Sequence, residues 1–227
     1  MPREAFERDL QRLQDEMVAL GSLVGKALVD AVEGLKQRDH ESSRQLIAQD
    51  QEVNRKRFEI ESDALILIAT QQPMATDLRV VAAVLEIVGE LERIGDYAKG
   101  IARINLMIGD QPLIKPLIDL PRMAHVASEM LHRALQTFVD RDEEAARAIP
   151  GVDDEVDALY NQVFRELLTL MMANPTNIDQ ATFLLWAAHN LERAADRAIN
   201  ICERVVYMVS GELTELSDSD DAQRAVK

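Results

Sequence analysis

Apolar residues recur every three or four positions along most of the chain, and no stretch shows the sustained alternation of a half-buried strand. In the first 37 residues one such stripe runs from Phe6 to Leu35. Asp39 is the expected N-cap of a second helix, and Gly211 the expected stop of the last one. The pattern predicts helices over residues 3–37, 40–70, 75–108, 122–139, 152–172 and 179–210. The chain is therefore expected to be all-α.

The predicted helices fall into two sets of three, separated by the proline-containing segment GDQPLIKPLIDLP. Similar stretches stand at matching places in the two sets, which indicates an internal repeat. The matching stretches are ELERIGD (90–96) with NLERAAD (190–196), QQP (71–73) with ANP (173–175), and AQDQEVN (48–54) with GVDDEVD (151–157). We expect one three-helix repeat in 1–108, a linker in 109–121, a second repeat in 122–211, and a disordered acidic tail in 212–227.

Composition and charge narrow the class of protein. Hydrophobic residues make up 47% of the chain and aromatic residues 4%, so a folded, mostly aliphatic core is expected. The net charge of −15 would repel a phosphate backbone, which argues against nucleic acid as a partner. Cys202 is the single cysteine, and no apolar run approaches the roughly 20 residues of a membrane span. A cytoplasmic protein is predicted, one that meets a membrane only through partners.

The repeated stretch carries an acidic pair in each half. Glu92 with Asp96, and Glu192 with Asp196, are four residues apart and therefore lie on one face of a helix. An isolated like-charge pair at this spacing costs about 0.2–0.5 kcal/mol. A nearby cation, a shifted pKa or a bound metal ion would offset this repulsion. In the first half we expect Arg103 to serve as a cation for Asp96.

The second helix of each half offers a related pair that can face the first. These pairs are Asp50 with Asn54 and Asp153 with Asp157. Together they would gather up to four oxygen-bearing side chains in each half, which are ligands for hard metal ions. The same acids could also form a solvated face neutralised by neighbouring arginines, as in a plain helical scaffold. Spacing alone leaves both possibilities open.

An enzyme of the di-metal carboxylate type is a further alternative. Such bundles place Glu-x-x-His pairs on two helices, and we expect no such pair in this chain. The chain also has no glycine-rich phosphate loop, no Gly-x-Ser-x-Gly elbow and no paired-cysteine zinc motif. These observations favour a protein that is not an enzyme.

Three stretches resemble the PhoU family of bacterial regulators of phosphate uptake. They are QQPMATDLRVV (71–81), ELERIGD (90–96) and NLERAADRAINICERVVYMVSGE (190–212). The resemblance implies a helical bundle of two repeats and a non-enzymatic adaptor between an ABC phosphate transporter, through its ATPase subunit, and a sensor histidine kinase. A homodimer is also expected, on the weak support of the small residues Gly89 and Gly100.

The resemblance further implies metal ions held by the acidic motifs, with Fe, Zn, Mn or Mg as the expected cofactors. Asn54 stands where an acid would complete the first-half motif, so weaker binding is expected there. Carried over by position, the metal ligands are Asp50, Glu92 and Asp96 in the first half, and Asp153, Asp157, Glu192 and Asp196 in the second.

Overall fold

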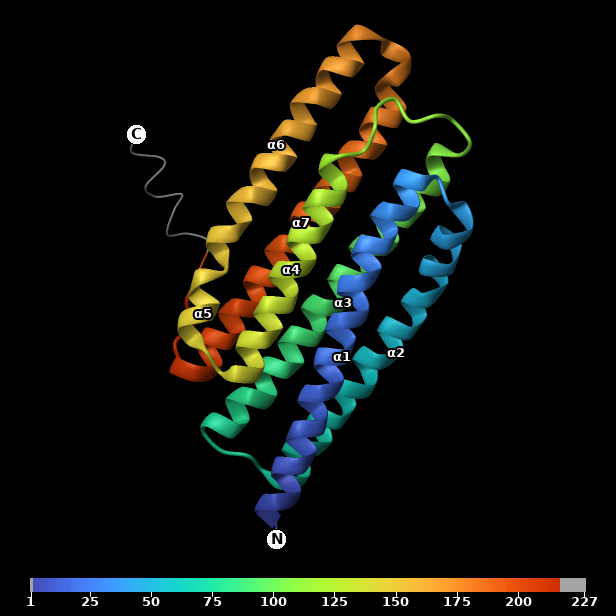
Figure 1. Cartoon of the computed structure of the whole chain (residues 1–227). Coiled ribbons are helices and arrows are strands. Elements are labelled where there is room, and N and C mark those ends of the chain that lie inside the picture. Colours follow the sequence, from blue (N-terminus) through green and yellow to red (C-terminus); the bar gives the residue numbers. More distant parts are fainter. Residues whose placement is uncertain (1, 217–227) are drawn as a thin grey trace, which may run out of the picture.

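The computed structural model describes residues 2–216 as a bundle of six long helices, one short helix and a 3-10 turn (Figure 1). In chain order these are α1 (Pro2–Gln37), α2 (His40–Gln71), α3 (Thr76–Ile108), α4 (Asp119–Asp140), α5 (Glu143–Ala148), α6 (Pro150–Ala173), η1 (Pro175–Asn177) and α7 (Ile178–Ser210). The predicted all-α class with two repeats is therefore confirmed.

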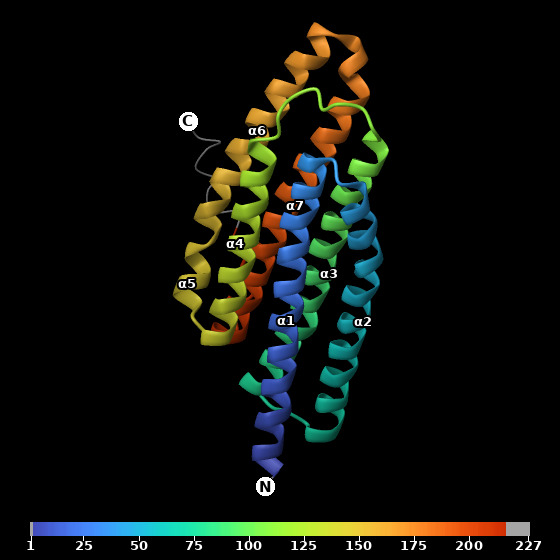
Figure 2. The ribbon, with the colours of Figure 1, turned by 45° about the vertical axis from the view of Figure 1, so that its right-hand side comes forward.

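The two sets of three helices lie side by side, with α1, α2 and α3 in one half and α4, α6 and α7 in the other (Figures 1 and 2). The halves meet where α1 packs on α4 and α3 packs on α7. The α3–α7 pair is antiparallel, because Arg79 Nε donates to the Met208 carbonyl oxygen while a Cβ on Gly100 would lie 2.8 Å from Asn190 Nδ2. Gly100 is therefore part of the contact between halves within one chain.

The core is aliphatic and follows the predicted stripes. The apolar residues of α1 from Phe6 to Leu35 are buried, as are Leu184, Leu191 and Cys202 on α7. A fully buried Leu or Met side chain contributes about 1.5–3 kcal/mol through removal of apolar surface from water. Burial of this stripe on each long helix is what orients the remaining polar faces, including the acidic ones.

Two predicted helix ends are confirmed. The side chain of Asp39 accepts a hydrogen bond from the Ser42 amide at 2.9 Å, which satisfies one of the free N–H groups at the start of α2. Gly211 ends α7 in the left-handed conformation, with φ of 82°, and its N–H donates to the Tyr207 carbonyl oxygen.

The start of the second half differs from the prediction. Helix α4 begins at Asp119 instead of Arg122, because a proline in the first turn, here Pro121, lacks only an N–H that has no helical partner anyway. The short α5 was not predicted. Its N-cap is Asp142, whose side chain accepts from the Ala145 amide, and Pro150 then opens α6 two residues before the expected start.

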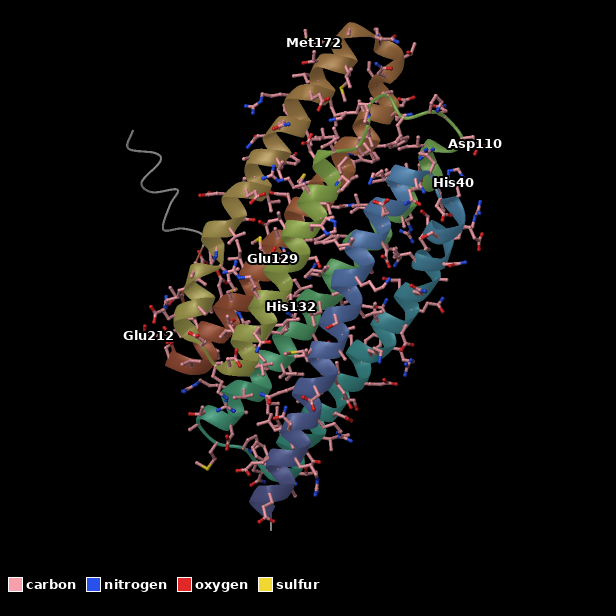
Figure 3. All side chains as sticks on the ribbon, in the orientation of Figure 1. His40, Asp110, Glu129, His132, Met172 and Glu212 are labelled. Atoms are coloured by element: carbon pink, nitrogen blue, oxygen red, sulfur yellow. The ribbon has the colours of Figure 1, made fainter. Side chains whose placement is uncertain are left out.

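The connecting segments are tied to the bundle. In the segment between α3 and α4, Ile114 N donates to the Gln180 side chain, which donates in turn to the Pro112 carbonyl oxygen. Figure 3 shows His40 and Asp110 at one end of the bundle, where their side chains are 3.7 Å apart.

Of the predicted disordered tail, residues 217–227 lie outside the described residues. At residue 216, the Leu216 amide donates to Glu203 Oε1. None of the helices in 2–216 combines the length and apolar character needed to cross a membrane.

Candidate functional site

The acidic pairs face one another as two clusters, one between α2 and α3 and one between α6 and α7. In the first, Lys99 connects Asp50 of α2 to Asp96 of α3. In the second, the carboxylates of α6 and α7 are close enough to repel one another. The expected meeting of the second and third helix of each half is thus present in the structure, and the surroundings of the two clusters differ.

The first cluster is organised around the ammonium group of Lys99. Its Nζ donates to Asp50 Oδ2 at 2.6 Å and to Asp96 Oδ1 at 3.2 Å. Asn54 Nδ2 also donates to Asp50 Oδ2, at 3.2 Å. Asp50 is only 7% exposed, and burying its charge without a partner would be costly. The hydrogen bond that Lys99 donates to Asp50 raises the pKa of Lys99, which keeps the ammonium charged.

The remaining carboxylate of the first cluster has its own cation. Arg57 Nη1 lies 3.4 Å from Glu92 Oε1, and Arg57 Nε donates to Glu61 at 2.7 Å. The hydrogen bond with Glu61 raises the pKa of Arg57. Two cations of the chain itself therefore offset most of the charge on the three carboxylates of the first cluster. Arg103 was the expected cation for Asp96, whereas in the structure Lys99 pairs with Asp96.

The second cluster holds Asp153 and Asp157 of α6 with Glu192 and Asp196 of α7. Burial, followed by repulsion from Asp157, Asp196 and Glu192, raises the pKa of Asp153 to about 7. Burial also raises the pKa of Glu192, with repulsion from Asp196 as the next cause. The pKa of Asp196 is raised by burial against the opposing effect of two arginines. The cluster therefore carries more negative charge than its surroundings balance.

The second cluster also leaves polar atoms without hydrogen-bond partners. Among the described residues, Asp153 Oδ1 and Glu192 Oε2 are buried and accept no hydrogen bond. His189 Nδ1 stands 3.1 Å from Glu192 Oε2 and forms an ion pair only when the imidazole is protonated. Arg193 Nε is 3.9 Å from Asp196 Oδ2, at the limit of an ion pair. Two buried carboxylate oxygens of the second cluster could therefore accept a proton or bind a cation.

The difference between the clusters follows from three positions of the repeat. At the offset of 100 residues that relates Glu92 to Glu192, Lys99 corresponds to Ile199, which is buried. At the offset of 103 that relates Asp50 to Asp153, Arg57 corresponds to Tyr160. The second half thus lacks both cations and has Asp157 in place of Asn54. The spacing of Lys99, three residues after Asp96, was a signal that could have identified it.

The donor chemistry of the second cluster suits a hard metal ion, since it consists of carboxylate oxygens, two of them orphaned. Within residues 2–216, however, no three His, Cys, Asp or Glu side chains converge as a group ready to hold a metal ion. The ligand types are therefore gathered without a preformed coordination shell. In the first cluster, the Lys99 ammonium pairs with two of the carboxylates that were expected to be metal ligands.

Two features outside the clusters bear on enzyme chemistry. Glu129 and His132 form a Glu-x-x-His pair on α4, so the expectation that the chain has no such pair is wrong. Both side chains are exposed (Figure 3). Inward-facing pairs on two helices are what a di-metal bundle requires. Burial raises the pKa of Cys202 to about 12, so its thiol is not a ready nucleophile.

Comparison with known proteins identifies the family. The model of the PhoU domain matches residues 17–104 and 120–205, one match in each half. The chain belongs to the PhoU family. The crystal structure of PhoU from Pseudomonas aeruginosa superposes with a TM-score of 0.85 at 31% identity, covering 91% of this chain and 100% of that one. The phosphate transport system regulatory protein PhoU from Streptococcus pneumoniae gives the same TM-score and identity, over 92% and 99% of the chains.

Full-length relatives of the PhoU family have similar sequences. The phosphate-specific transport system accessory protein PhoU homolog of Clostridium acetobutylicum is 33% identical, over 96% of this chain and 100% of its own. The homolog of Zymomonas mobilis is 37% identical, over 92% and 88%. These names describe accessory and regulatory proteins, and the chain is a member of this non-enzymatic family.

Proposed function

We propose that the protein is a regulator of phosphate uptake and of phosphate-starvation signalling in the cytoplasm. The observation that carries the proposal is similarity over nearly the whole chain to proteins named as accessory and regulatory components of phosphate transport. The protein would act as an adaptor between the ATPase subunit of an ABC phosphate transporter and a sensor histidine kinase. It would meet the membrane through these partners, and its net charge of −15 disfavours nucleic acid.

Co-purification tests the adaptor role. A tagged chain is recovered from gently solubilised membranes of its own host, grown with abundant phosphate, and the untagged chain serves as the control. The ATPase subunit and the kinase are expected in the tagged sample alone. Repeated recovery of neither partner would reject the role.

We further propose that the cluster of Asp153, Asp157, Glu192 and Asp196 holds a metal ion, with Fe, Zn, Mn or Mg as candidates. The support is the excess of carboxylates there, together with the two buried oxygens that accept no hydrogen bond. A bound cation would neutralise the repulsion between α6 and α7 and so join these helices. Small side-chain rotations would have to complete the ligand shell.

Binding of Mn²⁺ tests this site directly. Protein freed of metal with a chelator is titrated with Mn²⁺, and free Mn²⁺ is followed by electron paramagnetic resonance. Glu192→Gln keeps the shape of the side chain but removes its charge, and is expected to weaken binding at least about tenfold. Glu166→Gln, on α6 beside Lys115, is the matched control and should bind as the unaltered chain does. Equal binding by both variants would exclude Glu192 as a ligand.

A homodimer is also proposed. Its support from Gly100 is lost, because this glycine packs against Asn190 of the same chain. Exposed apolar residues four apart on α6, namely Phe164, Leu168 and Met172, offer another surface; Met172 lies at the far end of α6 in Figure 3. Light scattering coupled to size exclusion should give twice the 25.5 kDa chain mass. Leu168→Glu should then reduce the mass to that of one chain, and a single-chain mass without the substitution would contradict the dimer.

A further inference from the structure

We infer that Lys99 is the resident cation of the first cluster and that it closes this cluster to metal ions. The contrast with the second half rests on the proposed function, whereas the closure of the first half stands on its own contacts. The inference departs from the expectation that both acidic motifs hold metal.

The position of Lys99 is the first observation. Its Nζ lies 2.6 Å from Asp50 Oδ2 and 3.2 Å from Asp96 Oδ1, which is where an ion shared by the two carboxylates would sit. The Lys99 side chain is 21% exposed, so water screens it only in part. A divalent ion cannot share the space with an ammonium group, since two positive charges a few ångströms apart repel strongly in a partly buried site.

The surroundings of Asp50 are the second observation. Asp50 is only 7% exposed, and its Oδ1 accepts no hydrogen bond from the described residues. The cluster thus retains one unused, buried ligand atom beside the lysine. Asn54 presents its N–H to Asp50, and a donor in this place opposes a metal ion where a carboxylate would favour it.

The charge count is the third observation. With Lys99 in place, Asp50 and Asp96 share one ammonium, and Glu92 has Arg57. Without the ammonium, two carboxylates that face each other across α2 and α3 would lose their only described bridging cation. The first cluster would then resemble the second, in which the position of the lysine is taken by Ile199.

Lys99→Met tests the closure, since methionine keeps the length of the side chain and removes its charge. The substitution is made in a full chain whose second cluster is disabled by Asp153→Asn and Glu192→Gln. This background is expected to show at most weak, nonspecific Mn²⁺ binding. Lys99→Met is expected to create one site at least about tenfold tighter than that background binding. Lys26→Met, which removes an exposed lysine beside Asp30, is the matched control and should create none.

Two outcomes would overturn the inference. One is Mn²⁺ binding by the disabled background that is lost on Asp50→Asn, because metal would then enter with Lys99 present. The other is a folded Lys99→Met chain that gains no site. If methionine prevents folding, Lys99→Gln replaces it with the same readout.

A measurement on the unaltered chain is independent of any variant. Nitrogen-15 spectra of the lysine ammonium groups are recorded while Zn²⁺ is added. The Lys99 signal should keep its position at saturation, because the ammonium stays on Asp50. Displacement of that signal by Zn²⁺ would overturn the closure. Failure of the second-half site would instead leave Glu192→Gln without effect on Mn²⁺ binding, so the two proposals fail separately.

Discussion

The Lys99 ammonium donates to the buried carboxylate of Asp50 across the gap between α2 and α3 at 2.6 Å. This ion pair makes the two halves of a repeated structure chemically unequal. In the half that contains it, two cations offset most of the charge on the acidic cluster, and in the half without it the carboxylates have raised pKa values. The predictions below follow from this asymmetry and from the contacts that hold the bundle.

Loss of Lys99 should destabilise the fold. Lys99→Met leaves Asp50 buried without its cation, and the expected cost is about 2–3 kcal/mol, below the full value for a buried pair because Lys99 is partly exposed. Urea denaturation measures it. Lys26→Met breaks an exposed pair and should cost less than about 1 kcal/mol. Combining Lys99→Met with Asp50→Asn should restore part of the loss, whereas strict additivity would refute the coupling.

The metal-free protein should lose stability as pH rises. The unfolded chain ionises Asp153 near its ordinary pKa of 3.8, whereas the folded chain holds this proton until about pH 7. The folded state thus binds more protons between these values, and the free energy of unfolding falls through this window. After allowance for solvent screening, we expect the free energy of unfolding to fall by about 1 kcal/mol between pH 5.5 and 7.5.

Asp153→Asn tests the source of that dependence. The variant should be less sensitive to pH and more stable at pH 7.5, as measured by urea unfolding in the presence of a chelator. Asp154→Asn changes the exposed neighbouring carboxylate and should retain most of the slope. A slope that is unchanged in Asp153→Asn would show that other groups carry the effect.

The glycine that ends α7 should be sensitive to substitution. Gly211 has φ of 82°, and a Cβ there would lie 3.1 Å from Arg79 Nη1, so Gly211→Ala should cost about 1 kcal/mol or more. Gly89 lies inside α3 with open space around it, so Gly89→Ala should add about 0.5–1 kcal/mol of stability. Thermal unfolding of both variants measures the contrast, and equal shifts would refute it.

Substitution of Asn105 should destabilise the first half of the bundle. It is fully buried in α3, and its Nδ2 donates to the Gly34 and Asp39 carbonyl oxygens and to Ser43 Oγ. Asn105→Ala removes three buried hydrogen bonds that its Nδ2 donates and the Oδ1 that accepts from Arg38 Nη1, at an expected cost of about 2–4 kcal/mol. Gln136→Ala removes an exposed side-chain bond and should cost less than about 0.5 kcal/mol, as urea unfolding would show. A cost below 1 kcal/mol for Asn105→Ala would mean that the network is not required.

Local pattern was enough to predict the helices and the repeat. The stripe from Phe6 to Leu35 is buried as expected, and Asp39 caps α2. Helix α5 was not predicted, because a helix of 6 residues is too short for a periodic signal and depends on its cap and on packing. The start of α4 was placed too late, because Pro121 was treated as a break in the helix although it is tolerated in the first turn.

The sequence by itself determined that each half carries acidic side chains on one helix face, because a spacing of four residues defines a face wherever the helix packs. It also determined that the two pairs of a half could meet. Only the tertiary structure decided their charge balance. Lys99 and Arg57 offset most of the charge of the first cluster because α2 and α3 are rotated so that these long side chains reach across. Burial between α6 and α7 raises the pKa of Asp153. Helix rotation and burial depend on contacts from the whole bundle, and local spacing does not contain them.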